Sequence, residues 1–142
     1  MSNKDILVKI IVADYYKEVS ESLVRSAISF LEDNKIDYEV INVPGVYEIP
    51  QMIKWQINQK KLNLFIALGC VLKGDTYHFE VISDSVGKSL LDLVNANSKT
   101  IITNGIINAY NMKQALNRSK MNKKNKGLEA SSAMLRMIKC LI

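Results

Sequence analysis

One short segment of the chain holds the residues best suited to acid–base chemistry. It reads Gly74-Asp75-Thr76-Tyr77-His78 and contains the only histidine of the sequence. An imidazole both accepts and donates protons near neutral pH, so His78 is a candidate for proton transfer, with a structural role as the alternative. Asp75 and Thr76 are typical helix-capping residues, and the free N–H groups of a first helical turn bind anions. The segment therefore predicts an anion site beside His78, although capping alone would also explain Asp75 and Thr76.

The elements around this segment alternate between strand and helix. Continuous apolar runs predict strands over 6–13, 38–43, 62–72 and 100–107, the last interrupted by Asn104-Gly105. Apolar residues at helical spacing predict helices from Val19 to about Glu32 and over 48–60, 77–97, 112–118 and 126–142. Short strand–helix–strand connections force parallel, right-handed crossovers. We therefore expect one domain over residues 1–142, a flavodoxin-like three-layer α/β/α sandwich around a central four-stranded parallel sheet.

Polar and aromatic turns follow each expected strand. In an open parallel sheet these turns meet at one edge, where ligands bind. Tyr15 and Tyr47 either pack at the rim or stack on a planar ligand. Glu48 either complements the dipole of the helix that it begins or hydrogen-bonds a polar ligand. The third turn is Lys73 to His78, and the fourth is Asn104 to Asn111.

Composition excludes several classes of protein. Hydrophobic residues make up 48% of the 142 residues and charged residues 23%, which is typical of a globular domain. We expect no membrane span, because no apolar run approaches ~20 residues. The start of the chain lacks the long apolar run of a signal peptide, and Cys70 and Cys140 have no partner at metal-ligand spacing, so we expect reduced thiols in a cytoplasmic protein.

A basic run accounts for much of the formal net charge of +5. The run contains no aromatic residue for base stacking, so we expect no nucleic acid partner. A solvated basic loop and a small anionic substrate, such as a phosphate ester, remain the two interpretations. No dinucleotide fingerprint, phosphate-binding loop, metal cluster or nucleophile elbow occurs in the sequence. We expect acid–base chemistry without a bound cofactor or metal. The run comprises Arg118, Lys120, Lys123, Lys124 and Lys126.

Three segments, in this order, resemble the lumazine synthase family. They are Val43-Pro44-Gly45-Val46-Tyr47-Glu48-Ile49-Pro50, the segment from Gly69 to Glu80, and Gln114-Ala115-Leu116-Asn117-Arg118 followed by Asn125-Lys126-Gly127. The resemblance implies condensation of 5-amino-6-(D-ribitylamino)uracil with 3,4-dihydroxy-2-butanone 4-phosphate in riboflavin biosynthesis. It also implies a homo-oligomer, a pentamer or a multiple of pentamers, with each site shared by adjacent subunits.

The resemblance also implies a role for each residue that matches the family's motifs. His78 would transfer protons, and four residues would bind phosphate: Asp75, Thr76, Arg118 and Lys126. Tyr15, Val46, Tyr47 and Glu48 would bind the ring and the ribityl chain, and Cys70, Val71 and Leu72 would offer mainly backbone contacts. Asn104 stands where the family often places a phenylalanine that reaches into the neighbouring subunit's site.

Two other classes of protein fit the pattern less well. A flavin- or lumazine-binding storage protein on the same fold is favoured by Asn104 and disfavoured by His78 and Arg118, because binding a flavin needs neither. A receiver domain would carry a phosphoacceptor aspartate directly after the third strand, where this chain has Lys73-Gly74.

Overall fold

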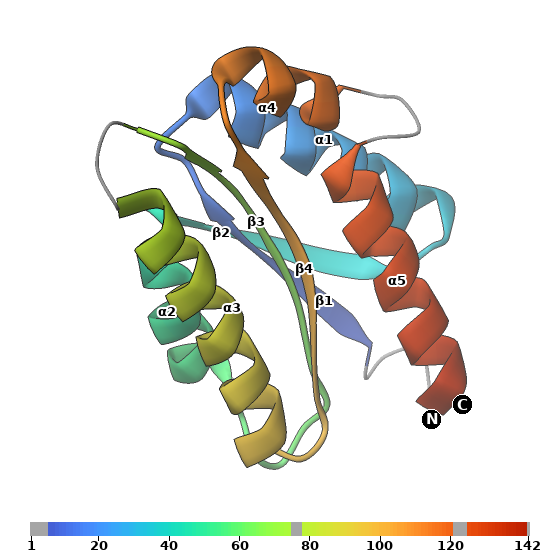
Figure 1. Cartoon of the computed structure of the whole chain (residues 1–142). Helices are drawn as coiled ribbons and strands as arrows, with labels where there is room; N and C mark the ends of the chain where they lie inside the picture. The colour runs from blue at the N-terminus through green and yellow to red at the C-terminus, as the bar shows by residue number, and fades with distance from the viewer. Residues whose placement is uncertain (1–5, 75–77, 121–124, 142) are drawn as a thin grey trace.

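The computed structural model describes residues 6–74, 78–120 and 125–141. Its four strands are β1 (Leu7–Ala13), β2 (Asp37–Val43), β3 (Asn63–Leu72) and β4 (Thr100–Ala109). They pair in parallel in the order β2-β1-β3-β4 (Figure 1). The predicted four-stranded parallel sheet is confirmed. The predicted phosphate-side residues Asp75 and Thr76 lie outside the described residues.

Helices cover both faces of the sheet, as the predicted sandwich requires (Figure 1). One layer contains α1 (Lys17–Asp33), α4 (Met112–Ser119) and α5 (Lys126–Leu141). The other contains α2 (Ile49–Gln56), preceded by the 3₁₀ turn η2 (Val46–Glu48), and α3 (His78–Ala96). The carboxyl ends of all four strands point to the same edge of the sheet, which we call the carboxyl edge.

The side chains of each inner strand divide between two hydrophobic cores. Ile10 and Ile66 pack in the core under α1 and α5, whereas Ile11 and Phe65 pack in the core under α2 and α3. All four side chains are buried. Successive strand residues point to opposite faces, and both faces are covered, so these strands need continuous apolar runs. The sheet is thereby a rigid support for the turns at the carboxyl edge.

The helix predicted over residues 48–60 is shorter in the structure. Its α-helical part ends at Gln56, and Ile57 has the extended dihedrals φ −66° and ψ 126°. The side chain of Asn63 holds the following turn, because its Oδ1 accepts from the Asn58 N–H at 2.9 Å and its amide donates to the Asn58 carbonyl at 3.0 Å. Asn58 and Asn63 thus form a turn where apolar spacing alone suggested further helix.

The prediction that Asn104-Gly105 interrupts the fourth strand is wrong. β4 runs without a break to Ala109, with Asn104 opposite Ala67 and Gly105 opposite Leu68. Gly105 is needed for close packing, since a Cβ there would lie 2.6 Å from Leu68 Cδ2 and 3.0 Å from the Lys126 carbonyl oxygen. Asn104 therefore lies on the open edge of β4, about 16 Å before its end at ~3.3 Å per residue.

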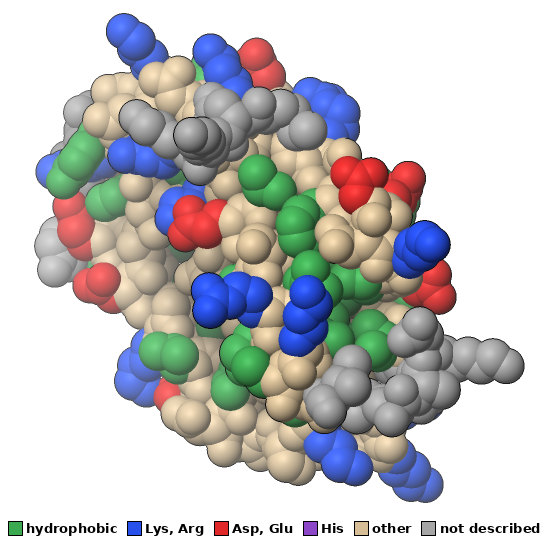
Figure 2. Space-filling view, turned by 90° about the vertical axis from the view of Figure 1, so that its right-hand side faces the viewer, with side chains coloured by type: hydrophobic (Ala, Val, Ile, Leu, Met, Phe, Trp, Pro, Cys, Tyr) green, Lys and Arg blue, Asp and Glu red, His purple; other side chains and the backbone are tan. Residues whose placement is uncertain are grey.

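The face that carries α5 has both apolar and basic side chains. Figure 2 shows hydrophobic side chains in patches between Lys and Arg side chains on this face. Leu128, Met137 and Leu141 of α5 are large apolar side chains that remain exposed in the single chain. Within the described part of the chain, no helix is both long and apolar enough to cross a membrane.

Candidate active site

The turn after β1 presents an aromatic side chain at the carboxyl edge. Asn42 Nδ2 donates to Asp14 Oδ2 at 3.0 Å, and the Asp14 N–H donates to the Val43 carbonyl at 3.0 Å. These bonds fix the turn against the end of β2. Tyr15 is 74% exposed, and its ring meets that of Tyr16 edge-on at a centroid distance of 4.9 Å. Tyr15 thus offers a free ring face for a planar ligand.

The turn after β2 places Val46, Tyr47 and Glu48 beside β3. Val46 is buried against Gly69, where a Cβ would lie 2.8 Å from Val46 Cγ2. Tyr47 is 63% exposed. The half-buried Glu48 folds back toward Gly45, where a Cβ would lie 3.0 Å from Glu48 Oε1. Glycines at 45 and 69 therefore allow η2 to settle close to the sheet, with Tyr47 and Glu48 at its rim.

The end of β3 contributes mainly backbone to this edge. Cys70 and Val71 are buried, and Leu72 is half-buried. Burial raises the pKa of the Cys70 thiol to about 11. Burial, followed by the charges of Cys70 and Tyr15, also raises the pKa of the Tyr16 hydroxyl above its ordinary value. Cys70 is therefore a protonated core thiol and not a nucleophile at neutral pH.

Alkylation of Cys70 should consequently depend on pH in a defined direction. The thiol loses its proton near pH 9 in the unfolded chain and at about pH 11 in the folded chain, so folded-state stability falls as pH rises through this range. At pH 9 we expect iodoacetamide to modify Cys70 at least ~10-fold more slowly in the native protein than in urea. Mass spectrometry of the Cys70 peptide gives both rates. Equal rates in the two conditions would contradict a protonated, buried thiol.

A further group of side chains lies at the ends of β3 and β4 and in the first turn of α3. His78 is exposed as the first residue of α3. Lys73 Nζ lies 3.9 Å from Glu80 Oε1 and 5.3 Å from the centroid of the Tyr110 ring. The Lys73 N–H donates to the Ala109 carbonyl at 2.9 Å, which joins the ends of β3 and β4. Lys73 and Tyr110 belong to the predicted third and fourth turns, but they were not among the predicted site residues; the position of Tyr110 directly after an apolar run is the signal that points to it.

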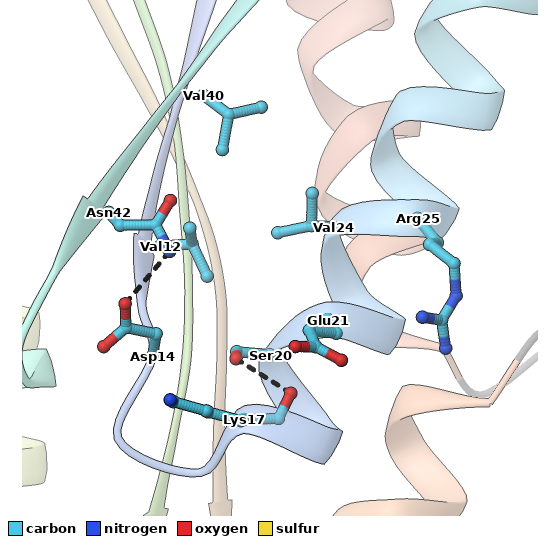
Figure 3. Close-up of a pocket in the computed structure, with 9 residues that line it drawn as sticks. All are labelled: Val12, Asp14, Lys17, Ser20, Glu21, Val24, Arg25, Val40 and Asn42. Atoms are coloured by element: carbon cyan, nitrogen blue, oxygen red, sulfur yellow. Dashed lines mark hydrogen bonds between the residues drawn. The ribbon is translucent and has the colours of Figure 1, made fainter.

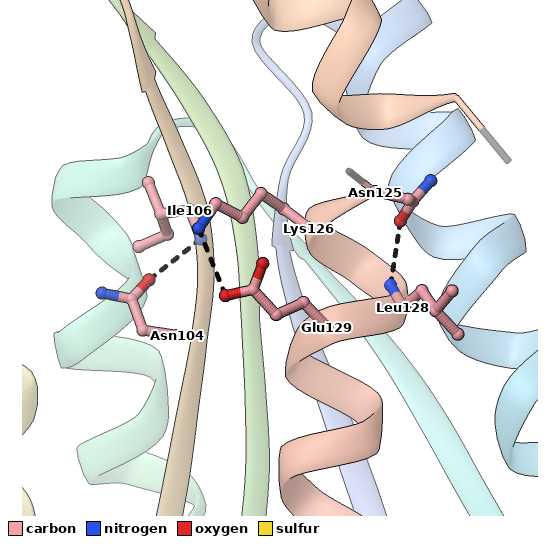
Figure 4. Close-up of polar contacts among 6 residues, drawn as sticks. All are labelled: Asn104, Ile106, Asn125, Lys126, Leu128 and Glu129. Atoms are coloured by element: carbon pink, nitrogen blue, oxygen red, sulfur yellow. Dashed lines mark hydrogen bonds and ion pairs between the residues drawn. The ribbon is translucent and has the colours of Figure 1, made fainter. Parts of the chain in front are cut away.

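A second group of predicted site residues lies apart from the first. Asn104 is on the open edge of β4, where its Oδ1 accepts from the Ile106 N–H at 2.9 Å. Lys126 begins α5 beside Gly105, and its Nζ is 3.4 Å from Glu129 Oε1 (Figure 4). Arg118, in the last turn of α4, has a buried Nη1 without a hydrogen-bond partner among the residues that the structure describes. A buried guanidinium nitrogen without a partner is costly, which favours an anionic ligand at this position.

The single chain also has two hollows, one beside the turn that presents Tyr15 and one at the opposite edge of the sheet. A cavity of about 390 Å³ between β2 and α1 is lined by Asp14, Lys17, Glu21, Arg25 and Asn42, among others (Figure 3). A hollow of about 750 Å³ lies at the opposite, amino edge of the sheet and includes Lys9, Lys60, Lys61 and Lys99. Neither is lined by a predicted site residue.

The chemistry available at the carboxyl edge is proton transfer and polar binding. Over residues 6–74, 78–120 and 125–141, no cluster of histidine, cysteine, aspartate and glutamate has the arrangement to hold a metal ion. The edge instead gathers an imidazole, a carboxylate and exposed tyrosine rings at the ends of parallel strands. Such an arrangement defines an α/β enzyme that binds small organic molecules beyond the carboxyl ends of its strands.

Comparison with known proteins identifies the family. The model of the 6,7-dimethyl-8-ribityllumazine synthase family matches residues 5–141, and the chain belongs to this family. It is 40% identical over 131 residues to the 6,7-dimethyl-8-ribityllumazine synthase of Bartonella bacilliformis, which covers 91% of this chain and 86% of the relative. It is 34% identical over 128 residues to the synthase of Zymomonas mobilis, which covers 90% of this chain and 91% of the relative.

Proposed function

We propose that this chain is a 6,7-dimethyl-8-ribityllumazine synthase of riboflavin biosynthesis. It condenses 5-amino-6-(D-ribitylamino)uracil with 3,4-dihydroxy-2-butanone 4-phosphate and releases inorganic phosphate and water. The observation that carries the proposal is the family match over residues 5–141, which includes all three motif segments. The polar carboxyl edge supports it, because the reaction needs proton transfers and polar binding in one place.

The pyrimidine substrate supplies its own nucleophile in this reaction. Its 5-amino group attacks the ketone of the butanone phosphate, and loss of water gives an imine. Loss of phosphate and attack of the ribitylamino nitrogen then close the second ring, with loss of a second water. His78 carries protons between these intermediates, for which its exposed place at the start of α3 is suitable. No enzyme nucleophile is required, in agreement with a protonated Cys70 thiol.

The pyrimidine and its ribityl chain occupy the turns after β1 and β2. Tyr15 stacks on the ring, which its 74% exposure supports. Glu48 accepts hydrogen bonds from ribityl hydroxyls, and Val46 and Tyr47 bound the same pocket. Cys70, Val71 and Leu72 bind through backbone groups, which agrees with the burial of the side chains of Cys70 and Val71.

The phosphate of the second substrate is bound by Arg118 and Lys126, together with Asp75 and Thr76. A guanidinium binds a phosphate with two parallel hydrogen bonds. The lack of a hydrogen-bond partner for Arg118 Nη1 within the described part of the chain supports this role. Lys126 adds a point charge that Glu129 partly offsets at 3.4 Å. The first N–H groups of α3 contribute to the same anion site.

The complete site forms between neighbouring subunits of a homo-oligomer, a pentamer or a multiple of pentamers. Support comes from the position of Asn104 and Lys126 beside the open edge of β4, away from Tyr15 and Glu48. In the pentamer, Asn104 of one subunit reaches the carboxyl edge of the next. The cytoplasm is the proposed location, since the chain has two free cysteines, one of them exposed.

Incubation of the purified full chain with both substrates tests the function. We expect fluorescent lumazine to form at a rate proportional to enzyme concentration, and no product when either substrate is omitted. Sedimentation of the same sample measures the oligomeric state. If the chain binds lumazine or riboflavin tightly but forms no product, the storage-protein alternative replaces the synthase.

A further inference from the structure

One buried amide side chain joins three helices close to the proposed phosphate site. Asn125 is 1% exposed. Its Nδ2 lies within hydrogen-bond distance of Ser26 Oγ at 2.7 Å, the Ser119 carbonyl at 2.8 Å and the Lys120 carbonyl at 2.6 Å. Its Oδ1 accepts from the Leu128 N–H at 2.8 Å. Every polar atom of this side chain is therefore engaged, which fixes its position.

These bonds connect the two segments that carry the phosphate-side cations. Ser119 and Lys120 directly follow Arg118, so the amide donor holds the carboxyl end of α4. The bond from the Leu128 N–H caps the start of α5, whose first residue is Lys126 (Figure 4). Asn125 therefore fixes the position of the carboxyl end of α4, which carries Arg118, relative to the start of α5, which carries Lys126.

The third helix of the junction, α1, provides a fixed base. Ser26 Oγ, which accepts from Asn125, itself donates to the Ser22 carbonyl at 3.0 Å. The start of α5 also lies against α1, because a Cβ at Gly127 would lie only 2.4 Å from the Leu23 carbonyl oxygen. Gly127 packs tightly against α1, so we expect loss of the amide bonds to act mainly on the carboxyl end of α4.

We infer that Asn125 is a positioning residue that holds Arg118 and Lys126 in the arrangement in which they bind the phosphate of the substrate. The inference rests on the proposed function. Asn125 does not touch the substrate itself, since its side-chain atoms are used within the protein. A displacement of about 1 Å in a binding group costs up to ~10²-fold in rate, so a loose α4 terminus would weaken phosphate recognition strongly.

Kinetics of Asn125→Ala and Asn125→Ser test the inference. Serine retains an oxygen that caps α5 but lacks the amide donors to Ser119 and Lys120. The serine variant therefore distinguishes the effect of the helix cap from the effect of the hydrogen bonds to α4. For both variants we expect KM for the butanone phosphate to rise by about tenfold or more, with KM for the pyrimidine within about twofold of wild type. Thermal stability should fall less for the serine variant than for the alanine variant.

Asn63 offers a matched control at the amino edge of the sheet. It too is buried, accepts from one backbone N–H, and donates to two backbone carbonyls, those of Asn58 and Lys61. Asn63→Ala should lower thermal stability with both KM values unchanged. The positioning role would be overturned if Asn63→Ala and Asn125→Ala changed the two KM values in the same way. It would also be overturned if Asn125→Ser raised the KM values of both substrates equally.

A second measurement separates this inference from the proposed function. Calorimetric titration of inorganic phosphate into wild type and Asn125→Ser requires no turnover. We expect the serine variant to bind phosphate about tenfold more weakly, whether or not lumazine forms. Equal phosphate affinity in the two proteins would overturn the inference. If wild type forms no lumazine but still binds phosphate more tightly than Asn125→Ser does, only the synthase assignment is overturned.

Discussion

His78→Ala should slow lumazine formation by about 10²-fold or more in kcat, the usual contribution of a positioned acid–base group. His78 is exposed at the start of α3, on the edge that also presents Tyr15, Tyr47 and Glu48. The reaction includes several proton transfers, and no other histidine exists in the chain to replace this one. The KM values of both substrates should change little, because proton transfer affects the transition states and not ground-state binding.

Two further variants distinguish proton transfer from a structural role of His78. His78→Gln keeps a hydrogen-bonding side chain but cannot shuttle a proton, so it should be as slow as His78→Ala at unchanged thermal stability. Lys88→Ala is the matched control on the same helix, since it removes only an exposed ion pair with Asp92 at 2.8 Å. A wild-type rate in His78→Gln would eliminate His78 as the proton-transfer group.

Arg118→Ala should raise KM for the butanone phosphate by about 10- to 100-fold. A hydrogen bond to a charged group contributes about 1.5–3 kcal/mol, and 1.4 kcal/mol corresponds to a factor of ten in affinity. Within residues 6–74, 78–120 and 125–141, Arg118 Nη1 is buried without a hydrogen-bond partner, which favours an anionic ligand for this guanidinium. The pyrimidine carries no phosphate, and its KM should stay within about twofold of wild type.

Arg118→Lys and Arg136→Ala complete this experiment. Lysine keeps the charge but not the planar pair of donors, so KM for the phosphate substrate should lie between those of wild type and Arg118→Ala. Arg136 is an exposed arginine about 15 Å along α5 from Lys126 at ~1.5 Å per residue, and its removal tests for a nonspecific loss of charge. Equal weakening of both substrates in Arg118→Ala would argue against a phosphate contact.

Local patterns in the sequence determined the architecture of this protein. The apolar run that ends at Leu72 is a strand because its side chains face two cores, one under α1 and α5 and one under α2 and α3. A strand that is buried on both faces is recognised in a sequence as a run without polar residues. The turns after β1 and β2 were also predictable, since the carboxyl ends of parallel strands meet at one edge.

The sequence was ambiguous where one residue type serves two purposes. Asn104-Gly105 has the composition of a turn, yet Gly105 permits the close approach of Leu68 and α5 to an unbroken β4. Likewise, the helical spacing that continues past Gln56 gave no sign of the turn that Asn58 and Asn63 build through side-chain hydrogen bonds. In both cases the deciding contacts are made by residues or groups outside the local pattern.

Only the tertiary structure placed the predicted site residues in two separate groups. The sequence could place Tyr15, Glu48 and His78 at one edge, because strand ends determine that edge. It could not place Asn104 on the open side of β4, nor reveal that Asn125 bonds Ser26 across 99 residues of sequence separation. Such contacts depend on how helices and strands pack and on the burial of individual polar atoms, which periodicity does not encode. The residue types and their order thus determined the fold and the edge to which the polar turns lead, whereas packing determined where Asn104, Arg118 and Lys126 lie.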